Sequence, residues 1–378
     1  MKIFIQTFGC QMNARDSEAL LGLFLRRGYK SADNPKDADI ILLNTCSVRA
    51  HAEHRVRSIL GSYKKILTKR YLLNANRPII GLIGCMAKTS GEDILKKMQH
   101  VSLVAGPSAE DRIVDYVDDI IKTGRRIIDL DDRVRDEEFY VASYRIEPNH
   151  AQVIISTGCS NFCSYCVVPF VRGQIRPRNP EDIIAEIKRN ISLGIKKITL
   201  LGQNVNDYRY RPHSSSQLPT SFIDLLKMVD RINGVEEIDF LTPHPKNTSE
   251  KLFQVMARSE KIKKYLHLPY QSGSDRILQL MNRGYTRAEY LKLVKKYKKI
   301  VNGTLGTDII VGFPTETEDD FLRTKEVLEK VRFMGAYIFK YSPRPATKAE
   351  KLKDDVPQSV KEKRHAQLLE LQKKISNE

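Results

Sequence analysis

The chain has 378 residues, of which 41% are hydrophobic and 29% charged. Its longest apolar runs, such as Pro78–Cys85, are far shorter than a membrane span, and the start at Met1 lacks the pattern of a signal peptide. These properties exclude a membrane protein and predict a soluble, cytoplasmic one that is long enough for two domains.

A net charge of +17 and a pI near 9.5 set the chain apart from an average soluble protein. Such an excess suits a partner rich in phosphate, and RNA is the first candidate. The alternative is that lysine-rich helices only keep the chain in solution, and charge by itself does not decide between the two.

Residues 1–128 alternate strand and helix patterns, which predicts an open, mostly parallel sheet of the Rossmann or flavodoxin-like type. The run Asp39–Asn44 is typical of a parallel strand that is buried on both faces. Strands are expected at 2–8, 39–44, 77–83 and 102–105, and helices at 14–27, 53–67, 92–99 and 109–122.

Three of the six cysteines, Cys10, Cys46 and Cys85, each come directly after one of these strands. Ligands of open α/β sheets gather at the carboxyl ends of the strands, so we expect the three thiols to meet at one edge. Together they could hold an iron–sulfur cluster. The alternative is three inert cysteines that pack as small hydrophobic side chains.

Residues 129–150 have too little apolar content for a core element and are expected to form an interdomain linker. From residue 151 to 378, six strand patterns each precede a helix, which predicts a partial (β/α)6 barrel with its site at the carboxyl ends of the strands. The strands are expected at 153–156, 197–201, 237–241, 265–268, 307–311 and 336–341, and the helices at 180–193, 221–232, 249–259, 275–282, 287–300, 318–331 and 358–375.

The other three cysteines, Cys159, Cys163 and Cys166, follow the first strand of this barrel with C-x3-C-x2-C spacing. Three thiols can bind one [4Fe–4S] cluster and leave one iron without a protein ligand, whereas electron carriers usually supply four cysteines. The spacing therefore indicates an iron kept for a small molecule. A zinc knuckle would need a fourth nearby Cys or His, and none follows closely.

Further polar side chains lie in the segments that follow the barrel strands. Gln203, Asn204, Gln271 and Ser272 offer hydrogen bonds suited to an amino acid and a ribose, and Tyr165 could cover a cluster. The set expected to bind a cofactor is Tyr165, Gln203, Asn204, Thr242, His267, Gln271, Ser272 and Val311.

The motifs together resemble the methylthiotransferases of the radical S-adenosylmethionine (SAM) superfamily. They are Gly9–Asn13, Asp16–Glu18, Asn44–Arg49, Gly84–Met86, Cys159–Gly173, Leu201–Tyr208, His267–Ser274, Asp308–Thr317 and Tyr341–Pro345. Members of this family end in a small RNA-binding β-barrel called TRAM, and this sequence ends instead with the helix expected at 358–375.

The resemblance implies two [4Fe–4S] clusters, one on each cysteine triad, with SAM as radical source and methyl donor. The motif Leu201–Asn206 favours the branch that methylthiolates carbon 2 of N6-dimethylallyl (isopentenyl) adenosine beside the anticodon of tRNA. Branches that act on threonylcarbamoyl adenosine or on a ribosomal-protein aspartate carry different residues there. A non-catalytic iron–sulfur protein that binds RNA is the alternative from another class.

The implied partners are tRNA, an electron donor of the flavodoxin or ferredoxin type, and proteins that deliver sulfur or iron–sulfur clusters. The enzyme is expected to act as a monomer away from membranes. Candidates for contact with RNA phosphates are Arg55, Arg57, Arg172, Arg176 and Arg178.

Overall fold

The computed structural model describes residues 1–378 except 48–49, 73–76, 142–143, 213–217 and 378. Val48 and Arg49, which end one of the motifs above, therefore lie outside the described residues. The chain divides into two compact units: Met1–Pro148 with Phe170–Gly173, and Asn149–Pro169 with Gln174–Glu378. The boundary at residue 128 and the linker at 129–150 stay predictions.

The first unit is built on one parallel sheet with the strand order β2-β1-β3-β4-β5-β6. This is the flavodoxin-like order with one more strand at the end, and the direction of winding reverses between β1 and β3. The strands are β1 Lys2–Thr7, β2 Lys30–Ser31, β3 Ile40–Thr45, β4 Ile79–Gly84, β5 Leu103–Ala105 and β6 Ile127–Asp129. The helices are α1 Gln11–Arg26, α2 Ala50–Leu72, α3 Cys85–Lys97, α4 Ile113–Thr123 and α5 Glu137–Tyr140, with 3-10 turns η1 Pro35–Asp37 and η2 Pro107–Arg112.

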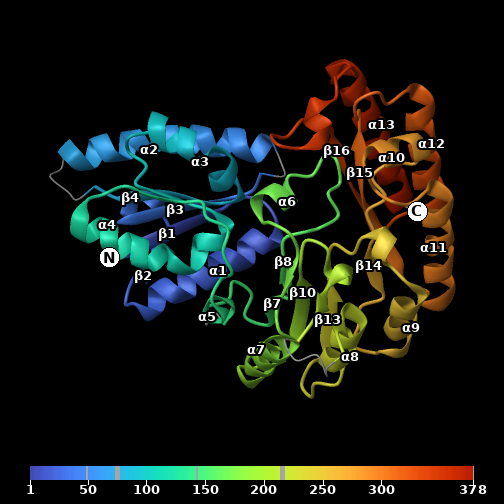
Figure 1. Ribbon diagram of the computed structural model, residues 1–378, viewed down its shortest axis with the longest axis horizontal. Helices are drawn as coiled ribbons and strands as arrows, with labels where there is room; N and C mark the ends of the chain where they lie inside the picture. Colours follow the sequence, from blue (N-terminus) through green and yellow to red (C-terminus); the bar gives the residue numbers. More distant parts are fainter. Residues whose placement is uncertain (48–49, 73–76, 142–143, 213–217, 378) are drawn as a thin grey trace. The chain divides into compact units, whose positions relative to one another are not determined.

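The alternation of side chains along β3 explains why both faces of this sheet are covered. Ile40 and Leu42 pack in a cluster with side chains of α1 and α4, whereas Ile41 and Leu43 pack with side chains of α2 and α3. Figure 1 shows the same two layers, with α2 and α3 on one face and α1 and α4 on the other. The predicted fold class of this unit is confirmed.

The second unit holds six parallel strands that follow one another in chain order. They form two hydrogen-bonded sets, β7-β10-β13 and β14-β15-β16, and a parallel bridge between Ile238 and Ile262 joins β13 to the residues before β14. This is the order of a partial (β/α)6 barrel, as predicted. The strands are β7 His150–Ile154, β10 Lys197–Leu201, β13 Glu237–Phe240, β14 Tyr265–His267, β15 Thr304–Val311 and β16 Gly335–Lys340.

The remaining elements of this unit are short pairs and covering helices. The antiparallel pairs are β8 Ser156–Thr157 with β9 Arg176–Pro177 and β11 Arg209–Tyr210 with β12 Thr220–Ser221. The helices are α6 Val168–Val171, which passes into the first unit, α7 Pro180–Ser192, α8 Phe222–Asp230, α9 Glu250–Arg258, α10 Asp275–Leu280, α11 Arg287–Ile300, α12 Glu318–Val331 and α13 Gln358–Asn377. The 3-10 turns are η3 Val205–Asp207, η4 Pro245–Asn247 and η5 Lys348–Lys351.

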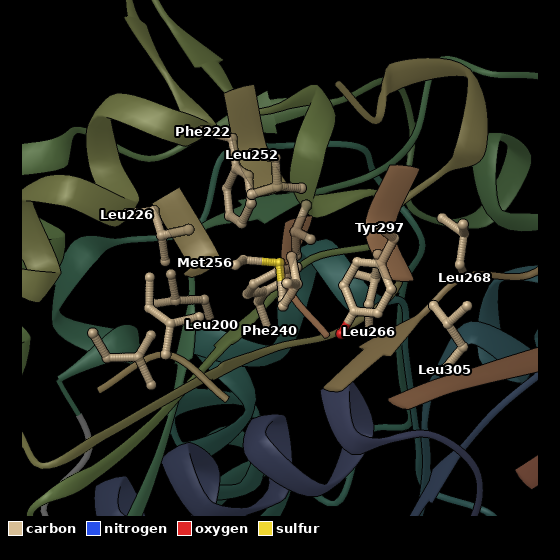
Figure 2. Close-up of a cluster of buried hydrophobic side chains, with 14 of the residues drawn as sticks. Leu200, Phe222, Leu226, Phe240, Leu252, Met256, Leu266, Leu268, Tyr297 and Leu305 are labelled. Atoms are coloured by element: carbon tan, nitrogen blue, oxygen red, sulfur yellow. The ribbon is translucent and has the colours of Figure 1, made fainter. Parts of the chain in front are cut away.

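Apolar side chains from successive strands fill the core of the second unit (Figure 2). Leu200 of β10, Phe240 of β13 and Leu266 of β14 are all at most 3% exposed. They lie in one cluster with Leu252 and Met256 of α9. Fully burying such a side chain contributes about 1.5–3 kcal/mol, so this core fixes the strands whose carboxyl ends carry the polar loops. None of the helices in the described part of the chain is long and apolar enough to span a membrane.

Candidate cofactor sites in the two units

The first cysteine triad lies at the carboxyl ends of three neighbouring strands of the first unit. Cys10 is the N-cap residue of α1, Cys46 follows β3 directly, and Cys85 is the first residue of α3. Because the winding reverses between β1 and β3, this edge is where an open α/β sheet binds its ligand. The positive end of a helix also favours a thiolate, which is the form that binds iron.

A network of neutral polar side chains fixes Cys10. Its thiol lies 3.1 Å from Oδ1 of Asn13, and Asn13 Nδ2 donates to Oδ1 of Asn44 at 2.7 Å. Nδ2 of Asn44 in turn donates to Oγ of Ser17 at 3.0 Å. A hydrogen bond with Cys46 is the largest cause that lowers the pKa of Cys10, to about 6, and the charge of Arg172 adds to it against the effect of burial. The surroundings of Cys10 therefore stabilise a thiolate.

A second network, of buried charges, lies beside the same triad. Arg172 donates from Nε to Sγ of Cys85 at 3.2 Å and from Nη2 to Oδ2 of Asp16 at 2.9 Å. Asp16 Oδ1 also accepts from Nη1 of Arg135 at 2.8 Å, and Arg135 contacts Glu110 at 3.2 Å. Burial would raise the pKa of Asp16, but the two arginines hold it below its usual value.

The second triad lies in a loop that the short β8–β9 pair closes at its base. Inside the loop Phe162 has a φ of 47°, and Asn282 donates to its carbonyl oxygen at 3.0 Å. Ser164 is fixed from two sides, because its N–H donates to Met281 O at 3.0 Å and its carbonyl oxygen accepts from Ala349 N at 2.8 Å. Contacts from distant segments thus hold the backbone between Cys159 and Cys166.

An arginine lies beside this triad as well. Arg283 Nη1 is 3.4 Å from Sγ of Cys163 and 3.3 Å from the hydroxyl of Tyr165, and the guanidinium lies 5.3 Å from the centre of the Tyr285 ring. His244 Nε2 is 4.0 Å from the same sulfur. Burial is the main cause that lowers the pKa of His244 to about 2, with Arg283 next, so this imidazole is neutral.

Both cysteine triads remain candidate sites for iron–sulfur clusters. All six cysteines are free of disulfides. Among the residues that the structure describes, no group of three or more His, Cys, Asp or Glu side chains is arranged to hold one metal ion. An iron–sulfur cluster is larger than one ion, and each triad offers three thiols, one of which is in contact with an arginine.

Asn204, His267 and Gln271, three of the residues expected to bind SAM, have buried polar side chains at or near the ends of strands. Asn204 Nδ2 and Gln271 Oε1 have no hydrogen-bond partner within the described residues. Gln271 has a φ of 65° and pairs through its backbone with Asp308 and Ile310, so its conformation is set by β15. His267 instead lies 3.1 Å from Asp308 Oδ1 and 3.3 Å from the Tyr265 hydroxyl, so its ring is already hydrogen-bonded.

The other expected SAM residues differ in exposure. Thr242 is exposed with a φ of 61°, Gln203 is half-buried, and Val311 is buried in the core of the second unit. Ser272 is buried, with its hydroxyl 3.4 Å from that of Thr324. Tyr165 packs against the small apolar cluster that contains Phe313 and Tyr341.

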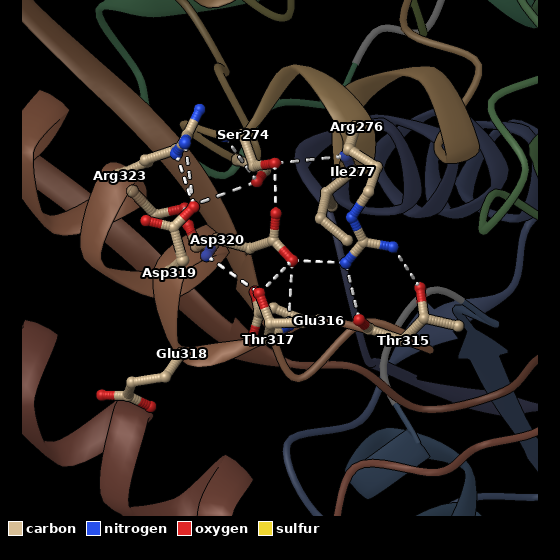
Figure 3. A network of polar contacts seen from close by, with 12 residues as sticks. Ser274, Arg276, Ile277, Thr315, Glu316, Thr317, Glu318, Asp319, Asp320 and Arg323 are labelled. Carbon is tan, nitrogen blue, oxygen red and sulfur yellow. Dashed lines mark hydrogen bonds and ion pairs between the residues drawn. The ribbon is translucent and has the colours of Figure 1, made fainter.

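A charged network links the loop after β14 to the loop after β15 (Figure 3). Asp320 of α12 accepts from the Ser274 hydroxyl at 2.5 Å and from the Thr317 N–H at 2.9 Å, and it pairs with Arg276. Since Ser274 caps α10 and follows Ser272, this network fixes the backbone that carries Gln271 and Ser272.

The arginines expected to contact RNA fall into two groups. Arg172 and Arg178 are 3% and 5% exposed, and Arg178 donates to Ile154 O at 2.6 Å and to Glu186 at 2.8 Å. Both therefore have partners in the protein. Arg55 is exposed and lies over the ring of Phe8, whereas Arg57 and Arg176 are half-buried.

Sequence reasoning did not assign Asp16, Arg135 or Arg283 to a site. Asp16 lies in a motif that carries the resemblance, but its partner Arg135 comes from the segment expected to be a linker. Arg283 follows a short helix, and nothing in its neighbourhood indicates that it meets Cys163, which is 120 residues earlier.

Two family models match parts of this chain. Residues 153–328 match the model of the radical SAM superfamily, and residues 2–106 match that of uncharacterized protein family UPF0004. A solved radical SAM methyltransferase, TsrM from Kitasatospora setae with cobalamin and a [4Fe–4S] cluster bound, superposes with a TM-score of 0.63 at 13% identity and covers 92% of this chain and 73% of that one. This likeness concerns the fold alone. The family match identifies residues 153–328 as a radical SAM domain.

Two curated relatives identify the family of this chain more closely. The tRNA-2-methylthio-N(6)-dimethylallyladenosine synthase of Aquifex aeolicus is 40% identical over 381 residues, which cover 100% of this chain and 84% of that protein. The synthase of Acetivibrio thermocellus is 42% identical over 377 residues, with 99% and 77% covered. The chain belongs to the family of tRNA-2-methylthio-N(6)-dimethylallyladenosine synthases.

Proposed function

We infer that this chain is an enzyme that adds a methylthio group to carbon 2 of N6-dimethylallyladenosine in tRNA, beside the anticodon. The observation that carries this inference is the identity of about 40% with synthases of that name over the whole chain. The two cysteine triads, each next to a buried arginine, fit the clusters that such chemistry needs.

In this proposal Cys159, Cys163 and Cys166 hold the cluster that binds SAM, and Cys10, Cys46 and Cys85 hold the auxiliary cluster. When bound, the clusters and SAM supply the radical, the sulfur and the methyl group. Arg283 orients the loop of the second triad through its contacts with Cys163 and Tyr165, and the neutral imidazole of His244 adds no charge there. We assign Asn204 and Gln271 to SAM, because each has a buried polar atom without a hydrogen-bond partner among the described residues. Further candidates are Gln203, Thr242, His267, Ser272 and Val311.

The tRNA is a suitable substrate because bases in a single-stranded loop can be turned out into a pocket. We assign phosphate contacts to Arg55, Arg57 and Arg176. We also propose that the enzyme works as a cytoplasmic monomer with an electron donor of the flavodoxin or ferredoxin type and with proteins that deliver sulfur or clusters.

An anaerobic reaction of the reconstituted chain with SAM, a chemical reductant and tRNA that carries N6-dimethylallyladenosine tests the proposal. The chain is expected to hold about eight irons, to form 5′-deoxyadenosine and to produce methylthiolated tRNA. Cluster binding with no 5′-deoxyadenosine would indicate a non-catalytic protein. Product only with threonylcarbamoyl-modified tRNA or with a ribosomal protein would indicate another branch of methylthiotransferases.

A further inference from the structure

Arg172 has a buried donor that none of the described residues satisfies. Its Nε donates to Cys85 and its Nη2 to Asp16, but the third nitrogen, Nη1, is buried without a hydrogen-bond partner within the described residues. Leaving a buried donor unpaired costs free energy, and for a charged group the cost is larger. This donor therefore indicates a further acceptor beside Cys85, one that the described residues do not supply.

The guanidinium is held in one orientation. Asp16 accepts from both Arg172 and Arg135, and Arg135 is itself fixed by Glu110 and by the ring of Phe139, 4.9 Å away. All of these side chains are nearly inaccessible to solvent. A planar group clamped in this way cannot turn to find another partner, so its free N–H groups stay beside the sulfur of Cys85.

The position of Arg172 in the chain is also informative. It comes six residues after Cys166, yet the segment Phe170–Gly173 belongs to the first unit and Cys166 to the second. One stretch of chain thus supplies a ligand to one triad and an arginine to the other. Arg178, further along the same stretch, differs from Arg172 in the partners of its guanidinium. It donates to the carbonyl of Ile154 and the carboxylate of Glu186.

We propose that Arg172 is a positioning residue for the auxiliary cluster: Nε fixes the sulfur of Cys85, and Nη1 donates to a sulfur of the cluster. This rests on the proposed function, which places a cluster on Cys10, Cys46 and Cys85. Net charge and hydrogen bonds to sulfur set the reduction potential of such clusters. A buried cation that donates to two sulfurs stabilises the more negative, reduced state and raises the potential.

The test uses the full-length chain with Cys159, Cys163 and Cys166 replaced by Ala, so that only the auxiliary cluster forms. This parent is compared with Arg172→Met and Arg172→Lys in the same background. Arg112→Met is the matched control, because Arg112 is a partly buried arginine of the same unit that pairs with Asp129 at 3.1 Å. Iron content, the midpoint potential from an electron paramagnetic resonance titration, and the circular dichroism of the apo chains are measured.

The parent and Arg112→Met are expected to bind about four irons with the same potential. Arg172→Met is expected to shift the potential downward, or to lose iron while its apo chain keeps the parent's circular dichroism. Full iron content at the parent's potential would overturn the proposal.

If the Met variant does not fold, the Arg172→Lys variant decides. Lysine keeps the charge but not the paired N–H groups, so a smaller downward shift of the potential is expected. An unchanged potential would overturn the role of Arg172. A parent that binds no iron would contradict the proposed function itself.

Discussion

A Cβ atom on Gly9 would lie 2.2 Å from Cβ of Cys46 and 3.1 Å from its sulfur. Gly9 also has a φ of 129°, which side chains rarely adopt. The loops after β1 and β3 therefore approach each other so closely that only glycine fits at position 9, against Cys46. This approach brings the two cysteines together at the point where the sheet reverses its winding.

Gly9→Ala is expected to displace Cys46 and to prevent the auxiliary cluster from forming. Iron content should fall from about eight to about four per chain, with the cluster on the second triad retained. Gly124→Ala is the matched control: Gly124 has a φ of 68° but no atom within 4 Å of the added Cβ. Gly124→Ala should lower the free energy of unfolding by about 1 kcal/mol and leave the iron content unchanged. Eight irons in Gly9→Ala would show that the close approach is not required.

Replacing one cysteine of each triad should reveal that the two triads have different roles. Cys163→Ala removes a ligand of the cluster that binds SAM, so both 5′-deoxyadenosine and methylthiolated tRNA should disappear. Cys46→Ala should leave that cluster in place because its ligands belong to the other unit, so 5′-deoxyadenosine should form without methylthiolated product. Chromatography of both products measures this. Full methylthiolation by Cys46→Ala would contradict the role of the auxiliary cluster as sulfur donor.

Asp320 should stabilise the second unit in a pH-dependent way. Burial opposes its charge, but Arg276, Ser274 and Thr317 hold its pKa below the ordinary value of 3.8. Because the folded pKa is lowered, its contribution is present above about pH 4 and is lost as pH falls through the folded pKa. Asp320→Asn should lower the free energy of unfolding of the apo chain by about 2 kcal/mol at pH 7 and by less below pH 4.

Asp319→Asn is the control for this change. Asp319 pairs with Arg323 at 2.9 Å, but 71% of its side chain is exposed, so its loss should change stability by less than about 1 kcal/mol. Denaturant unfolding of the three apo chains, followed by circular dichroism at both pH values, measures the difference. Equal losses from both variants at pH 7 would contradict the special role of Asp320.

Much of this fold can be predicted from local patterns. The apolar run before Asn44 marks a strand buried on both faces, and the capping residues Thr317 and Asp320 mark the start of α12. The start of α3 was predicted wrongly, at Glu92 instead of Cys85, because Thr89, Ser90 and Gly91 are poor helix formers. Gly91 is required there by packing, since a Cβ on it would lie 2.4 Å from Val104.

The places of Cys10, Cys46 and Cys85 at strand ends can be predicted, because each follows an apolar run. The role of both triads as cluster ligands stays a prediction. The arginines around them cannot be predicted in this way. Asp16 and Arg135 are 119 residues apart, and Arg172 and Cys85 are 87 apart, so their contacts depend on the tertiary fold. Arg172 was expected on an RNA-facing surface because a basic sequence does not reveal which of its charges are buried.

Binding of tRNA should depend steeply on salt, because phosphate contacts release counterions. Arg55→Met should weaken binding and reduce the slope of log affinity against log salt by about one. Arg27→Met is the control, since Arg27 is exposed but already paired with Asp115 and Asp118. Fluorescence anisotropy with labelled tRNA at several salt concentrations measures this. An unchanged slope for Arg55→Met would remove that residue from the interface.

The central claim is that the chain methylthiolates N6-dimethylallyladenosine in tRNA. Its most direct test is mass spectrometry of the nucleosides of total tRNA from cells with the gene, without it, and with Cys163→Ala restored. We predict 2-methylthio-N6-dimethylallyladenosine only in cells with the intact gene and unmodified N6-dimethylallyladenosine in the other two. The same amount of the methylthiolated nucleoside in all three strains would contradict the account.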